Sequence, residues 1–146
     1  MTPYRVGIVG LSWITTDPAG EATHPVLGTA VPGTHLSGMA NLPNVQVVAG
    51  CDIVPAARDR FIERWDATWP GLVAYDDYEQ MLADVPLDVV AVATPDHLHA
   101  PVVKAAARAG VKAVFCEKPI STHTDEVDEM ILAIEENGIV VNVNHT

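Results

Sequence analysis

The chain has 146 residues, of which 49% are hydrophobic and 18% are charged, and its formal net charge at pH 7 is −11. This length predicts a single domain that can bury a core without disulfides. Apolar stretches are too short to span a membrane, and the first residues do not form a signal-peptide pattern. With 8 Lys and Arg against 19 Asp and Glu, a basic nucleic-acid-binding surface is not expected. We therefore expect a cytoplasmic protein with neither nucleic-acid nor membrane partners.

Short β-branched apolar runs alternate with helical patterns along the chain. Strands are expected at 4–10, 45–52, 89–94, 112–117 and 139–144, with a weaker strand at 72–75. Helices are expected after the strands at 45–52, 72–75, 89–94 and 112–117. One begins at Pro55, a short one follows Asp76 or Asp77, one spans 97–109, and the last begins after Ser121 or Thr122. This alternation predicts an α/β fold with a doubly wound parallel sheet of about six strands.

The segment from Thr15 to Gly33 interrupts this alternation. It contains three prolines and three glycines, a density that is incompatible with a long helix. We expect an inserted Pro/Gly-rich loop within a single domain that spans residues 1–146.

Ligands of doubly wound sheets bind beyond the carboxyl ends of the strands, near the point where the strand order reverses. The first strand ends at Gly10, but Ser12 and Thr15 occupy positions where a dinucleotide fingerprint has glycine. An ordinary strand-to-loop turn therefore stays open for this segment. Asp52 ends the second strand, where a carboxylate accepts hydrogen bonds from ribose hydroxyls and repels a 2′-phosphate. This position favours NAD over NADP, although a simple strand-end aspartate is the alternative.

The fourth strand ends in Thr94 and Pro95, followed by Asp96, His97 and His99. On a helix, His97 and His99 point in nearly opposite directions and cannot share a metal ion, so no metal site is expected. We expect His99 to face the ligand cleft as a cofactor contact.

The fifth strand ends in Glu117 and Lys118. A lysine at this place can donate a hydrogen bond to a substrate hydroxyl or carbonyl and assist proton transfer, whereas a surface Glu–Lys pair is the alternative. Cys51 and Cys116 end apolar runs and are expected in the core. If Asp52 and Lys118 mark the two ends of a bound dinucleotide, both must lie at the same edge of the sheet.

The motifs along the chain resemble, in their order, those of one family. They are Gly10-Leu11-Ser12, Thr34-His35-Leu36, Cys51-Asp52, Thr94-Pro95-Asp96 with His99, Glu117-Lys118-Pro119 and Asn144-His145. Over essentially the whole chain, this resembles the N-terminal Rossmann domain of the Gfo/Idh/MocA family (glucose–fructose oxidoreductase, inositol 2-dehydrogenase and rhizopine-catabolism oxidoreductase). The resemblance implies the nucleotide-binding half of an NAD(P)-dependent oxidoreductase that acts on a sugar, a polyol or a derivative.

The resemblance also implies roles for individual residues. Gly10, Ser12, Trp13 and Ile14 would line the pyrophosphate, and Asp52 would bind the ribose. Thr94, Pro95, Asp96 and His99 would flank the nicotinamide half. Glu117 and Lys118 would lie beside the nicotinamide ring, with Lys118 as the catalytic residue that contacts the reacting hydroxyl.

The family's C-terminal substrate domain is not found in this sequence, which ends at Thr146. We therefore expect the chain alone to bind NAD(H) with little or no turnover, and to act on a sugar or polyol only together with such a domain. An apolar face left bare without that domain would favour a homodimer. Two other readings stay open: a non-catalytic module that senses NAD(H) or binds a partner, and a Rossmann-like domain of another class. In a methyltransferase, for example, Asp52 would hold the ribose of S-adenosylmethionine.

Overall fold

The computed structural model describes residues 2–17 and 33–145. Its strands are β1 (Tyr4–Val9), β2 (Val45–Cys51), β3 (Val73–Tyr75), β4 (Val89–Val92), β5 (Ala113–Glu117) and β6 (Val140–Asn144). Its helices are α1 (Trp13–Thr16), α2 (His35–Met39), α3 (Pro55–Trp65), α4 (Tyr78–Asp84), α5 (His99–Arg108) and α6 (Thr124–Asn137), with a 3-10 turn, η1 (Asp96–Leu98), before α5. Every predicted strand is present, with ends shifted by one or two residues.

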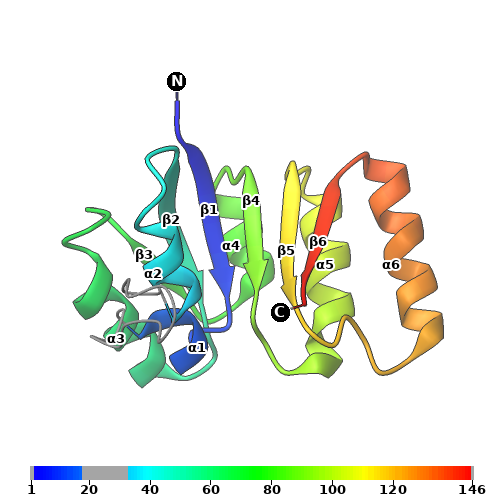
Figure 1. The fold of residues 1–146 in the computed structure, drawn as a ribbon, viewed down its shortest axis with the longest axis horizontal. Helices are drawn as coiled ribbons and strands as arrows, with labels where there is room; N and C mark the ends of the chain where they lie inside the picture. Colours follow the sequence, from blue (N-terminus) through cyan, green and yellow to red (C-terminus); the bar gives the residue numbers. More distant parts are fainter. Residues whose placement is uncertain (1, 18–32, 146) are drawn as a thin grey trace, which may run out of the picture.

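The strands form one parallel sheet in the order β3-β2-β1-β4-β5-β6. This confirms the predicted doubly wound sheet of six strands. The order reverses between β1 and β4, because β2 and β3 lie on one side of β1 while β4, β5 and β6 follow on the other. Since all strands run in one direction, their carboxyl ends meet at one edge of the sheet (Figure 1). That edge is where a ligand is expected.

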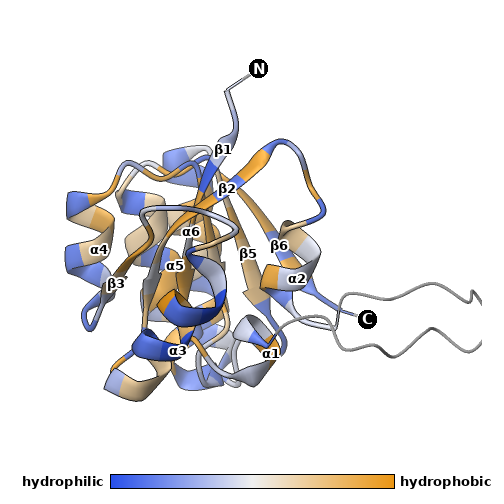
Figure 2. Ribbon diagram, turned by 90° about the vertical axis from the view of Figure 1, so that its left-hand side faces the viewer, coloured by the Kyte–Doolittle hydropathy of each residue, from blue (hydrophilic) through white to orange (hydrophobic). Residues whose placement is uncertain are grey.

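Two hydrophobic clusters cover the two faces of the sheet. One packs α5 and α6 against the sheet and contains the buried side chains of Val103, Val114 and Met130. The other packs α3 against β1 and β2 and contains the fully buried Ile8 and Phe61. The strands accordingly carry mostly hydrophobic residues (Figure 2). Near-continuous apolar strands are typical of parallel sheets with helices on both faces.

Cys51 and Cys116 are free thiols in the first of these clusters, as predicted. Burial, followed by the neighbouring Asp52 carboxylate, raises the pKa of Cys51 to about 12. Burial, followed by Glu117, raises the pKa of Cys116 to about 12. Both thiols are therefore protonated, and unreactive as nucleophiles, at neutral pH.

The predicted helix ends are correct in some places and wrong in others. The Asp77 carboxylate caps α4 by accepting from two backbone amides, and Gly138 ends α6 with a φ of 63°. The prediction of Ser121 or Thr122 as the cap of α6 was wrong. The helix begins at Thr124 after His123, and the Ser121 hydroxyl instead accepts from the His123 backbone amide at 3.0 Å. The Ser121 hydroxyl thus stabilises the turn before the helix.

The helices α1 and α2 flank the predicted inserted loop and were not themselves predicted. Thr15 and Thr16 lie within α1 and are buried, so the loop begins no earlier than Asp17. Residues 18–32 of this segment lie outside the described residues. The α2 helix is short, with its Leu36 side chain fully buried in the core, and neither helix is long enough to show a periodic pattern in the sequence.

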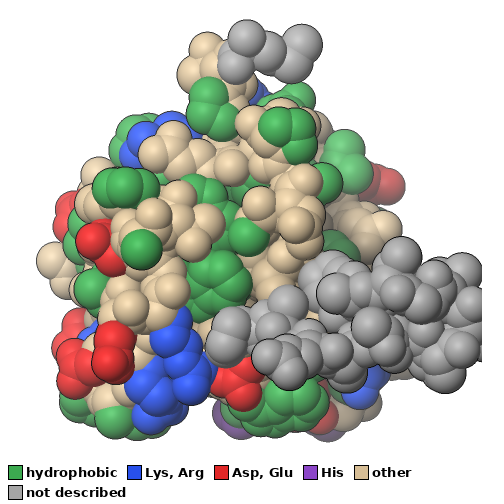
Figure 3. Space-filling view, turned by 60° about the vertical axis from the view of Figure 1, so that its left-hand side comes forward, with side chains coloured by type: hydrophobic (Ala, Val, Ile, Leu, Met, Phe, Trp, Pro, Cys, Tyr) green, Lys and Arg blue, Asp and Glu red, His purple; other side chains and the backbone are tan. Residues whose placement is uncertain are grey.

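Charged side chains of both signs lie beside one another on the surface. The face drawn in Figure 3 shows Lys and Arg side chains next to Asp and Glu side chains. Lys104 pairs with Glu129, and Lys112 Nζ lies 2.7 Å from Asp88 Oδ1. In the described part of the chain, no helix is long and apolar enough to cross a membrane.

Candidate functional site

A cavity of about 600 Å³ opens at the carboxyl edge of the sheet. Five of the predicted site residues line it: Trp13, Ile14, Thr94, Glu117 and Lys118. The rest of its wall consists of Gly33, Thr34, His35, Ala93, Phe115 and Asn144. The wall therefore comes from the ends of β4, β5 and β6 and from the first residues of α1 and α2. This volume lies within the range of cavities that hold small molecules and cofactors.

Gly10 joins β1 to α1 in a conformation that requires glycine. Its φ is +95°, and a Cβ on it would lie 2.5 Å from the carbonyl oxygen of Ala93 at the end of β4. Its backbone amide donates to the carbonyl oxygen of Cys51 at 2.9 Å. Gly10 thus allows β1, β2 and β4 to end close together. Ser12 precedes the four-residue helix α1 without a side-chain cap bond, and Trp13 is largely exposed.

Asp52 follows β2 and is held by two backbone amides. Its Oδ2 accepts from Leu11 at 2.8 Å, and its Oδ1 accepts from Val54 at 2.9 Å. The carboxylate therefore ties the end of β2 to the glycine turn after β1. Lys118 follows β5 in the same parallel sheet, so the two residues lie at one edge with β1 and β4 between them. Asp52 itself lies outside the wall of the cavity.

The loop after β4 brings Thr94 into the cavity wall and turns His99 away from it. The buried Oγ1 of Thr94 has no hydrogen-bond partner among the residues described. The Pro95 side chain is exposed, and an Asp96 carboxylate oxygen accepts from the His97 backbone amide at 2.9 Å. These residues therefore shape the loop between β4 and α5.

His99 does not lie where the sequence reasoning placed it. Its side chain is 1% exposed and does not line the cavity. Nδ1 lies 2.7 Å from the carbonyl oxygen of Pro119, and Nε2 lies 2.9 Å from the carbonyl oxygen of Thr94. The expectation of a ring facing the cleft was therefore wrong, because the 3-10 turn before α5 shifts the start of the helix. His99 instead connects the loops after β4 and β5.

Glu117 is surrounded by polar groups from three elements. Asn144 Nδ2 donates to its Oε1 at 2.7 Å, and the Lys118 backbone amide donates to its Oε2 at 3.2 Å. His35 Nε2 lies 2.8 Å from the same Oε1, an ion-pair distance without the alignment of a hydrogen bond. Burial raises the pKa of Glu117, but the contacts with Asn144, Lys118 and His35 outweigh it and hold that pKa below its usual range.

His35 and Asn144 were not predicted as site residues, although both lie in the motifs quoted above. Asn144 could have been found, because it ends β6 at the same edge as the other site residues. His35 carried no such signal, since 23 residues lie between Gly10 and Thr34 and no local pattern links α2 to the first strand. Among the residues described, no group of three or more His, Cys, Asp or Glu side chains could hold a metal ion.

Several known proteins with related sequences are oxidoreductases. The chain matches the model of the Gfo/Idh/MocA family, described as an oxidoreductase family with an NAD-binding Rossmann fold, over residues 4–145. Inositol 2-dehydrogenase from Salmonella typhimurium (strain LT2) is 34% identical over 140 residues, which cover 92% of this chain and 34% of that protein. The uncharacterized oxidoreductase YrbE of Bacillus subtilis (strain 168) is 31% identical over 109 residues, covering 75% of this chain and 30% of that protein.

Solved structures share the fold over nearly the whole chain. A dehydrogenase from Chromobacterium violaceum superposes with a TM-score of 0.77 at 25% identity, covering 98% of this chain and 36% of that one. A variant of a 3-ketoreductase from Actinomadura kijaniata, solved with TDP-benzene and NADP, gives a TM-score of 0.75 at 25% identity, covering 98% and 38%. The chain spans about a third of the length of the curated relatives it matches. A family match of this extent, on a sheet with this strand order, shows that the chain belongs to the Gfo/Idh/MocA oxidoreductases, as a domain with an NAD-binding Rossmann fold.

Proposed function

We propose that this chain is the dinucleotide-binding domain of an NAD(H)-dependent oxidoreductase that acts on a sugar, a polyol or a derivative. The observation that carries the proposal is the placement of Asp52 and the Glu117-Lys118 pair at one edge of the sheet, on opposite sides of the reversal in strand order. A dinucleotide in a Rossmann domain lies across this reversal. The sugar or polyol class follows the relatives, of which inositol 2-dehydrogenase is one.

The Asp52 carboxylate is suited to the adenosine ribose. Each of its oxygens accepts one backbone amide, from Leu11 or Val54, and keeps lone pairs for the ribose hydroxyls. Because these amides fix the carboxylate before the cofactor arrives, binding costs little side-chain entropy. Its negative charge disfavours a 2′-phosphate, so NAD is preferred over NADP.

The residues between the two ends fit the remainder of a dinucleotide. Gly10 lets the backbone approach closely, and Ser12, Trp13 and Ile14 follow it at the start of α1 beside the expected diphosphate. The Thr94 hydroxyl, buried and without a partner in the described structure, offers a hydrogen bond to the nicotinamide half. Pro95 and Asp96 lie in this loop at the edge of the site, and the His99 ring contacts it through the carbonyl oxygen of Thr94.

Lys118 is the proposed catalytic residue. It lines the cavity, its side chain is exposed, and its amine forms no ion pair with a carboxylate of the described residues. The ammonium can therefore donate a hydrogen bond to the oxygen of a substrate hydroxyl or carbonyl and stabilise charge that develops there. The bound nicotinamide supplies hydride transfer. Glu117, held by Asn144 and His35, offers an acceptor beside Lys118.

Turnover needs a second wall that holds the substrate against the nicotinamide and excludes water. The cavity opens at the sheet edge, and the chain spans about a third of its curated relatives. We therefore propose that the chain alone binds NAD(H) with little or no turnover, and that the substrate is chosen by residues outside it. A homodimer and a cytoplasmic location stay predictions, the first of which light scattering would test.

Calorimetric titration with NADH, NADPH and S-adenosylmethionine tests the proposal. We expect NADH to bind most tightly of the three. Asp52→Asn should lose about tenfold in NADH affinity, and the difference between its affinities for NADH and NADPH should become smaller. The control is Asp59→Asn, an exposed aspartate of α3, which removes the same charge without changing the site and should bind NADH like the unsubstituted chain. Binding of S-adenosylmethionine in preference to NADH, or no binding of either dinucleotide, would overturn it.

A further inference from the structure

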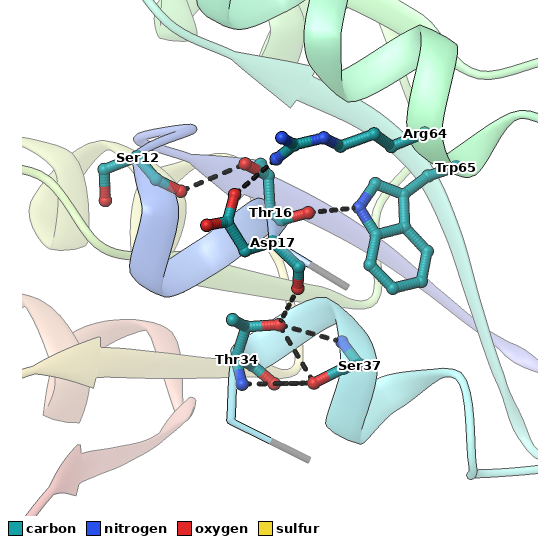
Figure 4. Close-up of polar contacts among 7 residues, drawn as sticks. All are labelled: Ser12, Thr16, Asp17, Thr34, Ser37, Arg64 and Trp65. Carbon is teal, nitrogen blue, oxygen red and sulfur yellow. Dashed lines mark hydrogen bonds and ion pairs between the residues drawn. The ribbon is translucent and has the colours of Figure 1, made fainter. Parts of the chain in front are cut away.

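A polar network joins the end of α1 to the start of α2 (Figure 4). Trp65 Nε1 of α3 donates to the carbonyl oxygen of Thr16 at 2.7 Å, and Arg64 of α3 pairs with the Asp17 carboxylate. The Thr34 hydroxyl donates to the carbonyl oxygen of Asp17 at 2.5 Å. Two helix ends that are distant in the sequence are thus tied to each other and to α3.

The same threonine starts α2. The Ser37 backbone amide donates to Thr34 Oγ1 at 3.3 Å, and the Thr34 backbone amide donates to Ser37 Oγ at 3.1 Å. This reciprocal pair satisfies two of the free amides at the beginning of a helix. Leu36, fully buried, anchors the next turn in the core. His35, between Thr34 and Leu36, is therefore fixed in position on a helix of only five residues.

His35 reaches across the cavity wall to Glu117. Nε2 lies 2.8 Å from Glu117 Oε1, and the imidazole packs edge-on against Phe115 with ring centres 5.3 Å apart. Asn144 donates to the same Oε1 from β6. The carboxylate oxygen Oε1 is thus in contact with two side chains, whereas among the described residues Oε2 accepts only from the backbone amide of Lys118, at 3.2 Å. The oxygen with spare acceptor capacity is Oε2.

We propose that His35 is a positioning residue for the nicotinamide end of the cofactor. Together with Asn144 it holds the Glu117 carboxylate by Oε1, which leaves Oε2 to accept a hydrogen bond from a hydroxyl of the nicotinamide ribose. A free glutamate side chain would lose rotamer freedom on binding, and a carboxylate that is already held loses little. This inference rests on the proposed function, and it adds a residue from α2 to a site that the sequence assigned to strand ends.

The test compares two ligands that share the adenosine end. NADH uses both ends of the proposed site, whereas ADP lacks the nicotinamide riboside. His35→Phe retains a ring against Phe115 but has no N–H, and His35→Gln retains an N–H donor. The control is His123→Phe, an exposed histidine before α6. Thermal unfolding shows that each variant is folded, and calorimetry gives both affinities.

We expect His35→Phe to weaken NADH binding by about tenfold, the size expected for losing one polar contact to a charged group, while ADP affinity stays within about twofold. His35→Gln should recover most of the NADH affinity, and His123→Phe should match the unsubstituted chain. If His35→Phe is poorly folded, Asn144→Leu removes the hydrogen bond that Oε1 accepts from β6 and should give the same selective loss.

Three results would overturn the inference. NADH affinity unchanged in His35→Phe would show that the contact with Glu117 is not used. Equal losses for NADH and ADP would show a general structural role instead. If the unsubstituted chain binds NADH no more tightly than ADP, the proposed nicotinamide subsite contributes nothing to binding. The proposed adenosine end of the site would not be affected by that result. Failure of both ligands to bind that chain is a different result, because it refutes the proposed function itself.

Discussion

Replacing Gly10 by alanine should destabilise the chain more than a glycine-to-alanine change at any other turn that the structure describes. The left-handed conformation costs an alanine about 1–2 kcal/mol. The new Cβ would also lie 2.5 Å from the Ala93 carbonyl oxygen and 2.6 Å from its carbon, and relieving such an overlap costs roughly 1–3 kcal/mol. We therefore expect a loss of roughly 2–5 kcal/mol in the free energy of unfolding. Because β1 and β4 must separate at the cavity, NADH affinity should also fall.

Urea unfolding followed by the fluorescence of the 3 tryptophans measures this loss. Gly71→Ala is the matched control, because Gly71 has a φ of +88° but a Cβ added to it would have nothing within 4 Å. It should lose only about 1–2 kcal/mol, from the backbone conformation alone, and should leave NADH binding unchanged. If Gly10→Ala and Gly71→Ala are destabilised to within about 0.5 kcal/mol of each other, the close approach of β1 and β4 is not what requires glycine.

Gly50→Ala would place a Cβ 2.7 Å from the buried Phe61 ring, so its urea midpoint should fall by the equivalent of about 1–3 kcal/mol. The pKa of Glu117 is below its ordinary value of 4.5 despite burial. The stability it contributes is therefore present above pH 4.5 and is lost as the pH falls through the lowered value, and Glu117→Gln should flatten this part of an acid-unfolding curve. Burial raises the pKa of Cys51 and of Cys116 to about 12, so a thiol reagent at pH 8 should label them far more slowly in the folded chain than in urea. Equal rates would contradict their burial.

The sheet and its functional edge could be predicted because parallel strands carry a strong signal. Each predicted strand is short and nearly continuous in hydrophobicity. The polar residues that follow three of them, Asp52, Thr94 and Lys118, lie at the carboxyl edge by topology alone. The buried face of α3 was also predictable, because a spacing of four residues places Phe61 and Trp65 on one side of the helix.

Other features depend on geometry that a local pattern does not encode. The orientation of His99 follows from the 3-10 turn before α5, whereas the prediction assumed a regular helix from residue 97. The start of α6 was misplaced because Ser121 and Thr122 both resemble caps, and only the Ser121 bond to the backbone of His123 shows where the turn ends. The place of His35 required knowing that the first residue of α2 contacts Phe115 and Glu117 of β5, about 80 residues away in the sequence.

The hydrogen bond from Thr34 to Asp17 closes a loop of the chain, because it joins two residues that are 17 positions apart in the sequence. The free-energy cost of such closure rises only with the logarithm of the number of residues enclosed. Homologous chains could thus lengthen or shorten the stretch between these two positions with little penalty, provided that both anchors keep their partners. Alignments that score gaps here as divergence would underestimate how similar the nucleotide-binding walls are.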